Sequence, residues 1–252
     1  MSDIDYLRGL YAAGEAKLEQ QAFGSAAEAF WWCEQYYALG AFPLYDMETE
    51  KMVQQARTRR LAICKDLHSP LMSKTSFVQG CQCEKLLWLY KNRYYLREVS
   101  EEMQQKFDGG HVIGELAQHF FEGGLDVSPF SAAHYPEMQQ RFPEKASSLP
   151  YKVKANVWLE NTRKILLEGT QYPIYEAAFL YENVLAAMDI LTFGDGKTVA
   201  YEVKASAQAK DVFITDCALQ YYVISHNIPL DDICLVLLNG DYLHEIQEDL
   251  RY

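Results

Sequence analysis

The sequence has few cysteines and no long apolar run, and each absence excludes a class of protein. Its six cysteines, at positions 33, 64, 81, 83, 217 and 234, are too sparse for a disulfide-stabilised scaffold in a chain of 252 residues. No apolar stretch approaches the roughly 20 residues that a membrane-spanning helix needs. The acidic N-terminus, Met1 to Asp5, lacks the basic and apolar regions of a signal peptide. We therefore expect a cytoplasmic protein with reduced thiols and no membrane partner.

Positive charge is also scarce, with 23 Lys and Arg against 35 Asp and Glu and a net charge of −12. Proteins that bind nucleic acid obtain most of their non-specific affinity from cationic contacts to phosphates. Either the basic residues gather on one face, or the partner is not a nucleic acid, and the charge of the whole chain does not separate these alternatives. Apolar residues make up 49% of the chain, which is ample for a buried core.

The first part of the chain has helical periodicity. Apolar and aromatic residues predict helices within residues 3–66, with a break at Gly24-Ser25, a second helix over 26–39 and a third over 46–65. His68-Ser69-Pro70 marks a boundary, so we predict a helical segment, 1–68, and a second domain, 69–252. Further helices are expected over 73–90, 111–121 and 156–168, with Asp108-Gly109-Gly110 as a break between the first two.

The C-terminal part changes to apolar runs typical of strands. Strands are predicted over 173–181, 184–193 and 198–204, a helix over 212–225, and a strand over 233–238 that a turn at Asn239-Gly240 joins to 242–246. The tight turns make the first three strands an antiparallel meander, and the helix after them permits a parallel crossover. The fold class is therefore α/β, with a central mixed sheet flanked by helices and an N-terminal helical segment.

A candidate catalytic centre lies on the second and third of these strands. Glu202 and Lys204 are two residues apart and project from the same side of a strand. Pairing across the turn at 194–197 brings Asp189 beside Glu202, and two adjacent carboxylates favour a raised pKa or a bound cation. Oxygen ligands without a thiolate suit Mg²⁺ or Mn²⁺, and Lys204 is placed to hold an attacking water and stabilise charge on a phosphate.

The E-x-K pattern alone is weak, because Glu15-Ala16-Lys17 matches it within a predicted helix. An exposed ion pair is the ordinary reading of such a pattern, and only the strand context and Asp189 favour a catalytic one.

Several stretches together resemble the PD-(D/E)XK nuclease superfamily, in its RecB-like branch, which includes the CRISPR-associated adaptation nucleases. The resemblance covers about residues 73–252 and leaves the N-terminal helices unexplained. It rests on five stretches: residues 73–89, 110–117, 187–190, 200–206 and 220–221. It implies a restriction-endonuclease-like core and hydrolysis of phosphodiester bonds in DNA, single-stranded or open-ended.

The resemblance also implies roles for matching residues. Four belong to the expected metal shell: His111, Asp189, Glu202 and the carbonyl of Val203. Lys204 matches the catalytic lysine, and Gln220 and Tyr221 match a helix motif that contacts the nucleic-acid backbone. Glu176 matches an acidic position that supports the site.

The cysteines depart from the pattern of those relatives that hold an iron–sulfur cluster. These relatives use one cysteine before the core and three near the C-terminus, whereas here only Cys234 follows the helix motif. Since a [4Fe–4S] cluster normally needs four thiolates, we predict that no such cluster is present. A separate zinc site on His111, Glu115 and His119 is disfavoured, because the order of residues is not that of the H-E-x-x-H motif.

A second candidate surface surrounds residues 85–97, where Lys85 and Arg93 alternate with aromatic residues. Aromatic rings can stack on unpaired bases while cations follow phosphates, and Lys74 and Ser76 are further candidates for phosphate contacts. The alternative is an amphipathic helix that packs on the sheet and leaves its cations in solvent.

Three functions remain open from the sequence. The first is an active Mg²⁺- or Mn²⁺-dependent deoxyribonuclease. The second is a nucleic-acid-binding module that keeps the nuclease fold with little or no catalysis. The third is an interaction protein that recruits a protein partner through residues 1–66.

Overall fold

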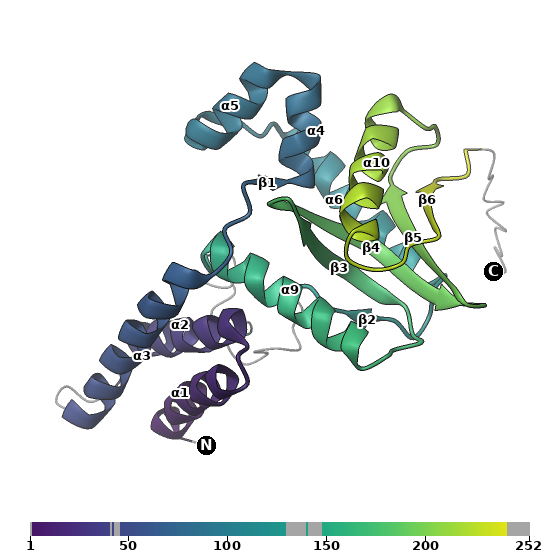
Figure 1. The fold of residues 1–252 in the computed structure, drawn as a ribbon. Helices are drawn as coiled ribbons and strands as arrows, with labels where there is room; N and C mark the ends of the chain where they lie inside the picture. Colours follow the sequence, from purple (N-terminus) through teal and green to yellow (C-terminus); the bar gives the residue numbers. More distant parts are fainter. Residues whose placement is uncertain (1, 41, 43–45, 130–139, 141–147, 241–252) are drawn as a thin grey trace, which may run out of the picture.

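The computed structural model describes residues 2–40, 42, 46–129, 140 and 148–240 (Figure 1). Its helices are α1 (Asp3–Glu19), α2 (Phe23–Leu39), α3 (Met47–Asp66), α4 (Lys74–Gln82), α5 (Glu84–Asn92), the 3₁₀ turn η1 (Tyr94–Leu96), α6 (Glu101–Gln118), α9 (Tyr151–Leu167) and α10 (Asp211–Ser225). Its strands are β1 (Met72–Ser73), β2 (Leu125–Asp126), β3 (Ile174–Tyr181), β4 (Val184–Gly194), β5 (Lys197–Lys204) and β6 (Asp232–Leu237). Among the described helices, none combines the length and apolar character needed to cross a membrane.

The strands form one mixed sheet in the order β2-β3-β4-β5-β6. β3, β4 and β5 are the predicted antiparallel meander, and β6 joins β5 in parallel through α10, so both topology predictions are confirmed. β1 adds a two-residue parallel pairing, Met72 with Val184 and Ser73 with Leu185. This pairing holds the start of α4 against the sheet.

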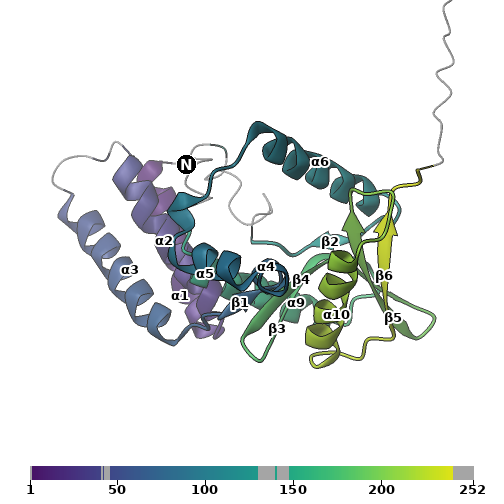
Figure 2. The same ribbon diagram turned by 90° about the horizontal axis from the view of Figure 1, so that it is seen from above.

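Helices cover both faces of the sheet, and α10 and α6 lie on opposite sides of it (Figure 2). Leu219, Val223 and Ile224 of α10 share a core cluster with Ala177 and Met188. Ala117 of α6 packs instead with Tyr175 and Ile190. A third small cluster joins Ala155 of α9 to Ala178 and Leu185.

Strand alternation is interrupted where β3 meets β4. Met188 and Ile190 are two residues apart, as are Tyr175 and Ala177, yet the members of each pair belong to different core clusters. Residues two apart in a regular strand face the same side. Glu176 and Asp189 lie between these pairs, and Glu176 has a φ of 58°, which a non-glycine residue rarely adopts. The interruption therefore coincides with two of the predicted site residues.

The N-terminal helices share a core with the second part of the chain. Phe30 and Tyr36 of α2 belong to the same buried cluster as Val153 and Val157 of α9. Glu160 of α9 also accepts hydrogen bonds from the backbone N–H groups of Gly24 and Ser25, at 2.6 and 2.9 Å. The segment 1–68 therefore has its own helices, but one hydrophobic core joins it to α9.

Some predicted boundaries differ from the structure. α6 begins at Glu101 and runs through Gly109-Gly110, so the expected break there is wrong. Ser100 caps this helix by accepting from Met103 N, and two glycines lower helix stability without preventing a capped helix. The predicted helix over 73–90 is divided at Cys83, whose backbone is extended. α9 begins at Tyr151 rather than 156, and the predicted strand over 242–246 lies outside the described residues.

Candidate functional site

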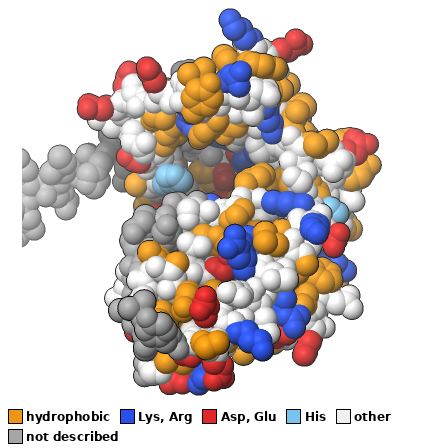
Figure 3. All heavy atoms as spheres, turned by 90° about the vertical axis from the view of Figure 1, so that its left-hand side faces the viewer, with side chains coloured by type: hydrophobic (Ala, Val, Ile, Leu, Met, Phe, Trp, Pro, Cys, Tyr) orange, Lys and Arg blue, Asp and Glu red, His pale blue; other side chains and the backbone are white. Residues whose placement is uncertain are grey.

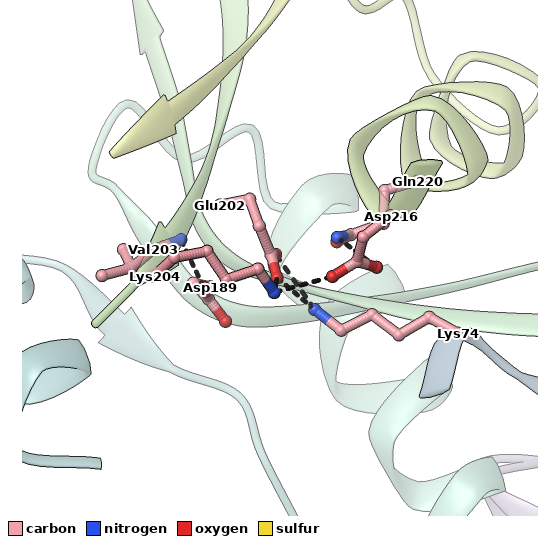
Figure 4. Close-up of polar contacts among 7 residues, drawn as sticks. All are labelled: Lys74, Asp189, Glu202, Val203, Lys204, Asp216 and Gln220. Atoms are coloured by element: carbon pink, nitrogen blue, oxygen red, sulfur yellow. Dashed lines mark hydrogen bonds and ion pairs between the residues drawn. The ribbon is translucent and has the colours of Figure 1, made fainter. Parts of the chain in front are cut away.

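The candidate site lies at the point where β4 and β5 begin to separate. Their last backbone pairing on this side joins Ile190 to Tyr201, so Asp189 and Glu202 follow it on the two strands. Beyond this pair, a side chain replaces the backbone as hydrogen-bond acceptor: Asp189 Oδ2 accepts from Val203 N at 2.7 Å. The two carboxylates expected from the sequence therefore lie on adjacent strands, with the backbone of Val203 between them (Figure 4).

Two lysines converge on Glu202, whose side chain is only 1% exposed. Lys74 Nζ lies 2.9 Å from Oε1 and 3.0 Å from Oε2 of this carboxylate, so it engages both oxygens. Lys204 Nζ also donates to Oε1, as the strand alternation predicted for these neighbouring residues of β5. Figure 4 shows the two ammonium groups reaching Glu202 from different elements, Lys74 from the start of α4 and Lys204 from the end of β5.

The buried face of α10 completes the cluster with an acid and an amide. Asp216 Oδ2 accepts from Lys204 Nζ at 2.7 Å, and its Oδ1 accepts from Gln220 Nε2 at 3.2 Å. Gln220 is fully buried, and its Oε1 has no hydrogen-bond partner among the described residues. An unsatisfied buried amide oxygen is costly, and it leaves an acceptor free beside the cluster.

The lysines decide the protonation state of Glu202. Burial by itself would raise the pKa of this carboxyl, but the charges of Lys74 and Lys204 outweigh burial and lower the pKa to about 2. The same attraction acts on the lysines, whose own burial would lower their pKa values. Both pKa values are instead raised, that of Lys74 through Glu202, Asp189 and Asp216. Glu202 and both ammonium groups are therefore charged at neutral pH.

Two further carboxyls, those of Asp189 and Glu176, carry the opposite shift. Burial and the neighbouring charge of Glu202 raise the pKa of Asp189 to about 6. Burial and the charge of Asp189 raise the pKa of Glu176 to about 8, so Glu176 holds a proton at neutral pH. Burial and mutual repulsion therefore shift both carboxyls toward the protonated form.

The donor set fits a hard divalent cation in charge and chemistry. Four carboxylates, those of Glu176, Asp189, Glu202 and Asp216, face two ammonium groups, which leaves a formal charge of −2 when every carboxylate is ionised. Within the described part of the chain, no group of three or more His, Cys, Asp or Glu side chains is placed to hold a metal ion. Mg²⁺, however, is commonly bound by one or two carboxylates, with water and substrate phosphate as the remaining ligands. Asp189 and Glu202 supply that number of carboxylates.

The remaining predicted residues are not all brought to the cluster. His111 is exposed on α6, and its side chain makes no hydrogen bond within the described residues. Ser76 is buried in the first turn of α4, where its N–H donates to the Ser73 side chain, so it is not accessible to a phosphate. Tyr221 follows Gln220 on α10 but is 40% exposed. Lys85 and Arg93 lie on the surface around α5.

Solvent reaches the cluster from the lysine side. The side chains of Lys74 and Lys204 are each 22% exposed, whereas Glu202 is enclosed beneath them. Figure 3 shows a hollow on one side of the molecule, with an acidic side chain visible inside and basic side chains below it. Hydrophobic side chains are abundant above this hollow.

Sequence reasoning missed two members of the cluster. Lys74 was expected to contact phosphate, and its place on Glu202 depends on the short pairing of β1 with β4. Asp216 was not expected at all, although it precedes Gln220 by one helical turn and therefore shares its side of α10. That spacing was the available signal.

Comparison with known proteins adds no family assignment. No family model matches the chain, and no curated protein or solved structure is significantly similar to it.

Proposed function

We propose that the chain is a divalent-metal-dependent nuclease that hydrolyses phosphodiester bonds in DNA, on a restriction-endonuclease-like core. The observation that carries this proposal is the buried cluster of four carboxylates and two lysines around Glu202. A purely structural ion-pair network gains little from an excess of buried carboxylates, because each unpaired charge is costly to bury. A site that exchanges protons for a divalent cation accounts for that excess.

Each member of the cluster has a chemical role in this proposal. Asp189 and Glu202 hold Mg²⁺ or Mn²⁺, which when bound lowers the pKa of a water molecule and polarises a phosphoryl oxygen. Hydrolysis forms a bond from water oxygen to phosphorus and breaks the bond from phosphorus to a deoxyribose oxygen, which leaves as a hydroxyl with a proton that the water supplies. Lys204 is kept charged by Glu202 and Asp216 and stabilises the negative charge that develops on the phosphate. Asp216 and Gln220 hold that lysine in place from α10.

An exposed basic and aromatic surface supports nucleic acid as the substrate. Residues 85–97 contain four Lys or Arg and no Asp or Glu, in a chain whose net charge is −12. Trp88 and Tyr95 are 55% and 76% exposed, and the Arg93 guanidinium lies 6.0 Å from the Trp88 ring centroid. Exposed rings beside cations suit unpaired bases and their phosphates. We therefore favour DNA with a single-stranded or open end over intact duplex.

Cleavage of a labelled oligonucleotide tests this proposal. The purified full chain should cut single-stranded DNA with Mn²⁺ or Mg²⁺ and stop when a chelator is added. Asp189→Asn and Lys204→Met should each reduce the rate by at least about 100-fold, in the range seen when one electrostatic catalytic group is lost. The matched controls are Asp195→Asn in the exposed β4–β5 turn and Lys197→Met at the exposed start of β5; they change the same charges and should cut like the parent.

The alternative of a binding module with little catalysis gives a different result. Lys74 already occupies both oxygens of Glu202, which is the observation that favours it. In that case single-stranded DNA would bind to the parent and to both site variants equally, and none of them would cut. Equal cutting by the parent, Asp189→Asn and Lys204→Met would instead show that any nuclease activity lies elsewhere.

A further inference from the structure

The two lysines on Glu202 are not equivalent. Lys204 Nζ is shared between Glu202 and Asp216, so it keeps a carboxylate partner if Glu202 binds another cation. Lys74 Nζ places both of its hydrogen bonds on Glu202, at 2.9 and 3.0 Å. It therefore lies where a cation that engages both oxygens of this carboxylate would lie.

We infer that Lys74 is an internal counter-ion, which occupies the Glu202 carboxylate in place of a divalent cation and has to withdraw before that cation can bind. The inference rests on the proposed function and identifies a residue that sets the metal affinity of the site. A second cation beside the Lys74 ammonium would be repelled, because two positive charges about 4 Å apart are only partly screened at the effective dielectric of a protein site. Displacement of Lys74 removes that repulsion and leaves a free ammonium beside the incoming phosphate.

The fold makes such a displacement feasible. Lys74 is the first residue of α4, and α4 is joined to the sheet by the two residues of β1. Ser73 caps α4 through its side chain, so the helix can keep its hydrogen bonds while the Lys74 side chain changes rotamer. The side chain is 22% exposed, so part of it already borders solvent.

The same contact stabilises the metal-free protein. Glu202 is almost completely buried, and a buried carboxylate that loses a counter-ion is strongly destabilised. Removal of the Lys74 ammonium should therefore have two effects of opposite sign: lower stability without metal, and tighter binding of a divalent cation. A lysine that only supports the fold would show the first effect without the second.

Mn²⁺ titration of the full chain without nucleic acid measures both effects. In Lys74→Met, the Kd for Mn²⁺ should fall by at least about tenfold, and thermal unfolding without metal should occur at a lower temperature than in the parent. Lys197→Met removes an exposed ammonium at the start of β5 and should change neither quantity. If the parent binds Mn²⁺ and Lys74→Met binds it equally or more weakly, the inference is overturned while the proposed metal site stands.

A measurement on the parent covers the case in which Lys74→Met does not fold. In a crystal soaked with Mn²⁺, Lys74 Nζ should lie beyond about 4 Å, the usual limit of an ion pair, from both Glu202 oxygens. Mn²⁺ bound to Glu202 with Lys74 still on both oxygens would overturn the inference alone. Absence of Mn²⁺ binding to the parent in solution and to the soaked crystal would overturn the proposed function together with it.

Discussion

Glu176 and Asp189 lie opposite each other on β3 and β4, between the backbone pairs Tyr175–Ile190 and Ala177–Met188. At this point the side-chain alternation of both strands is interrupted, and Glu176 has a positive φ. Strained backbone of this kind is often found at functional sites, because the surrounding structure must hold it in place. Here it brings a second acid next to Asp189, and Glu176 forms no ion pair with any of the residues that the structure describes.

Burying Glu176 beside Asp189 should make the free energy of unfolding depend on pH. Burial raises the pKa of Glu176 from 4.5 to about 8, so the folded state binds a proton that the unfolded state releases between these values. Stability should therefore fall as the pH rises from about 5 to 8. Glu176→Gln removes this titration, and its free energy of unfolding relative to the parent should increase over this range. The relative gain is on the order of 2 kcal/mol, because coupling to Asp189 divides the effect between the two groups.

Urea unfolding at pH 5, 6.5 and 8 measures this difference. Glu182→Gln, in the turn between β3 and β4, removes an exposed carboxylate from the same strand pair and serves as the control. Parallel pH profiles for the parent and Glu176→Gln would show that Glu176 is ionised in the folded protein.

The second prediction concerns the shared core of the N-terminal helices. A Cβ atom added to Gly24 would lie 2.7 Å from Val157 N and 2.8 Å from the carbonyl carbon of Asn156. Since both atoms belong to the backbone of α9, the helices would have to separate. Gly24→Ala should therefore destabilise the whole chain by about 2–4 kcal/mol, as overpacked or disrupted cores do.

Gly9→Ala is the matched control for Gly24→Ala. Gly9 also lies in an N-terminal helix, and an added Cβ there would meet nothing within 4 Å. This variant should be as stable as the parent or more stable by up to about 1 kcal/mol, because alanine favours helix. If Gly24→Ala melted only α1–α3 and left the sheet intact, the segment 1–68 would be an independent domain after all.

The third prediction concerns the exposed surface around α5. Trp88→Ala and Arg93→Met should each weaken binding of a single-stranded oligonucleotide by about tenfold, since one stacked base contributes roughly 1–3 kcal/mol. Fluorescence anisotropy at two salt concentrations measures the change. Only Arg93→Met should also reduce the salt dependence, because only that variant removes a phosphate contact.

Lys164→Met is the control for that surface. Lys164 lies on α9 with a 74% exposed side chain, and its loss changes the net charge by the same amount as Arg93→Met. Equal weakening by Lys164→Met would show that binding follows the total charge and not the α5 surface.

The local parts of the fold and site were predictable from the sequence. The alternation within β5 placed Glu202 and Lys204 on one side, and the short turn before it fixed the antiparallel pairing that brings Asp189 near. These contacts join strands that are adjacent in the sequence, so the side-chain alternation and the turn length are enough to predict them. They also predicted the parallel crossover from β5 through α10 to β6.

The parts that depend on distant contacts were not predictable. Lys74 reaches Glu202 across 128 residues of sequence, and its place depends on the two-residue strand β1 and on the packing of α4 against α10 and β4. A pairing that short leaves no periodic pattern in the sequence. The interruption of strand alternation at Glu176 was also not visible in the sequence. It appears only in how the residues on either side divide between the core clusters on the two faces of the sheet.

Calorimetric titration with Mn²⁺ shows whether Asp189 and Glu202 bind a divalent cation. We expect one Mn²⁺ per parent chain, loss of that binding in Asp189→Asn, and unchanged binding in Asp195→Asn. Equal Mn²⁺ binding by the parent and Asp189→Asn, or no specific binding by either, would contradict this expectation.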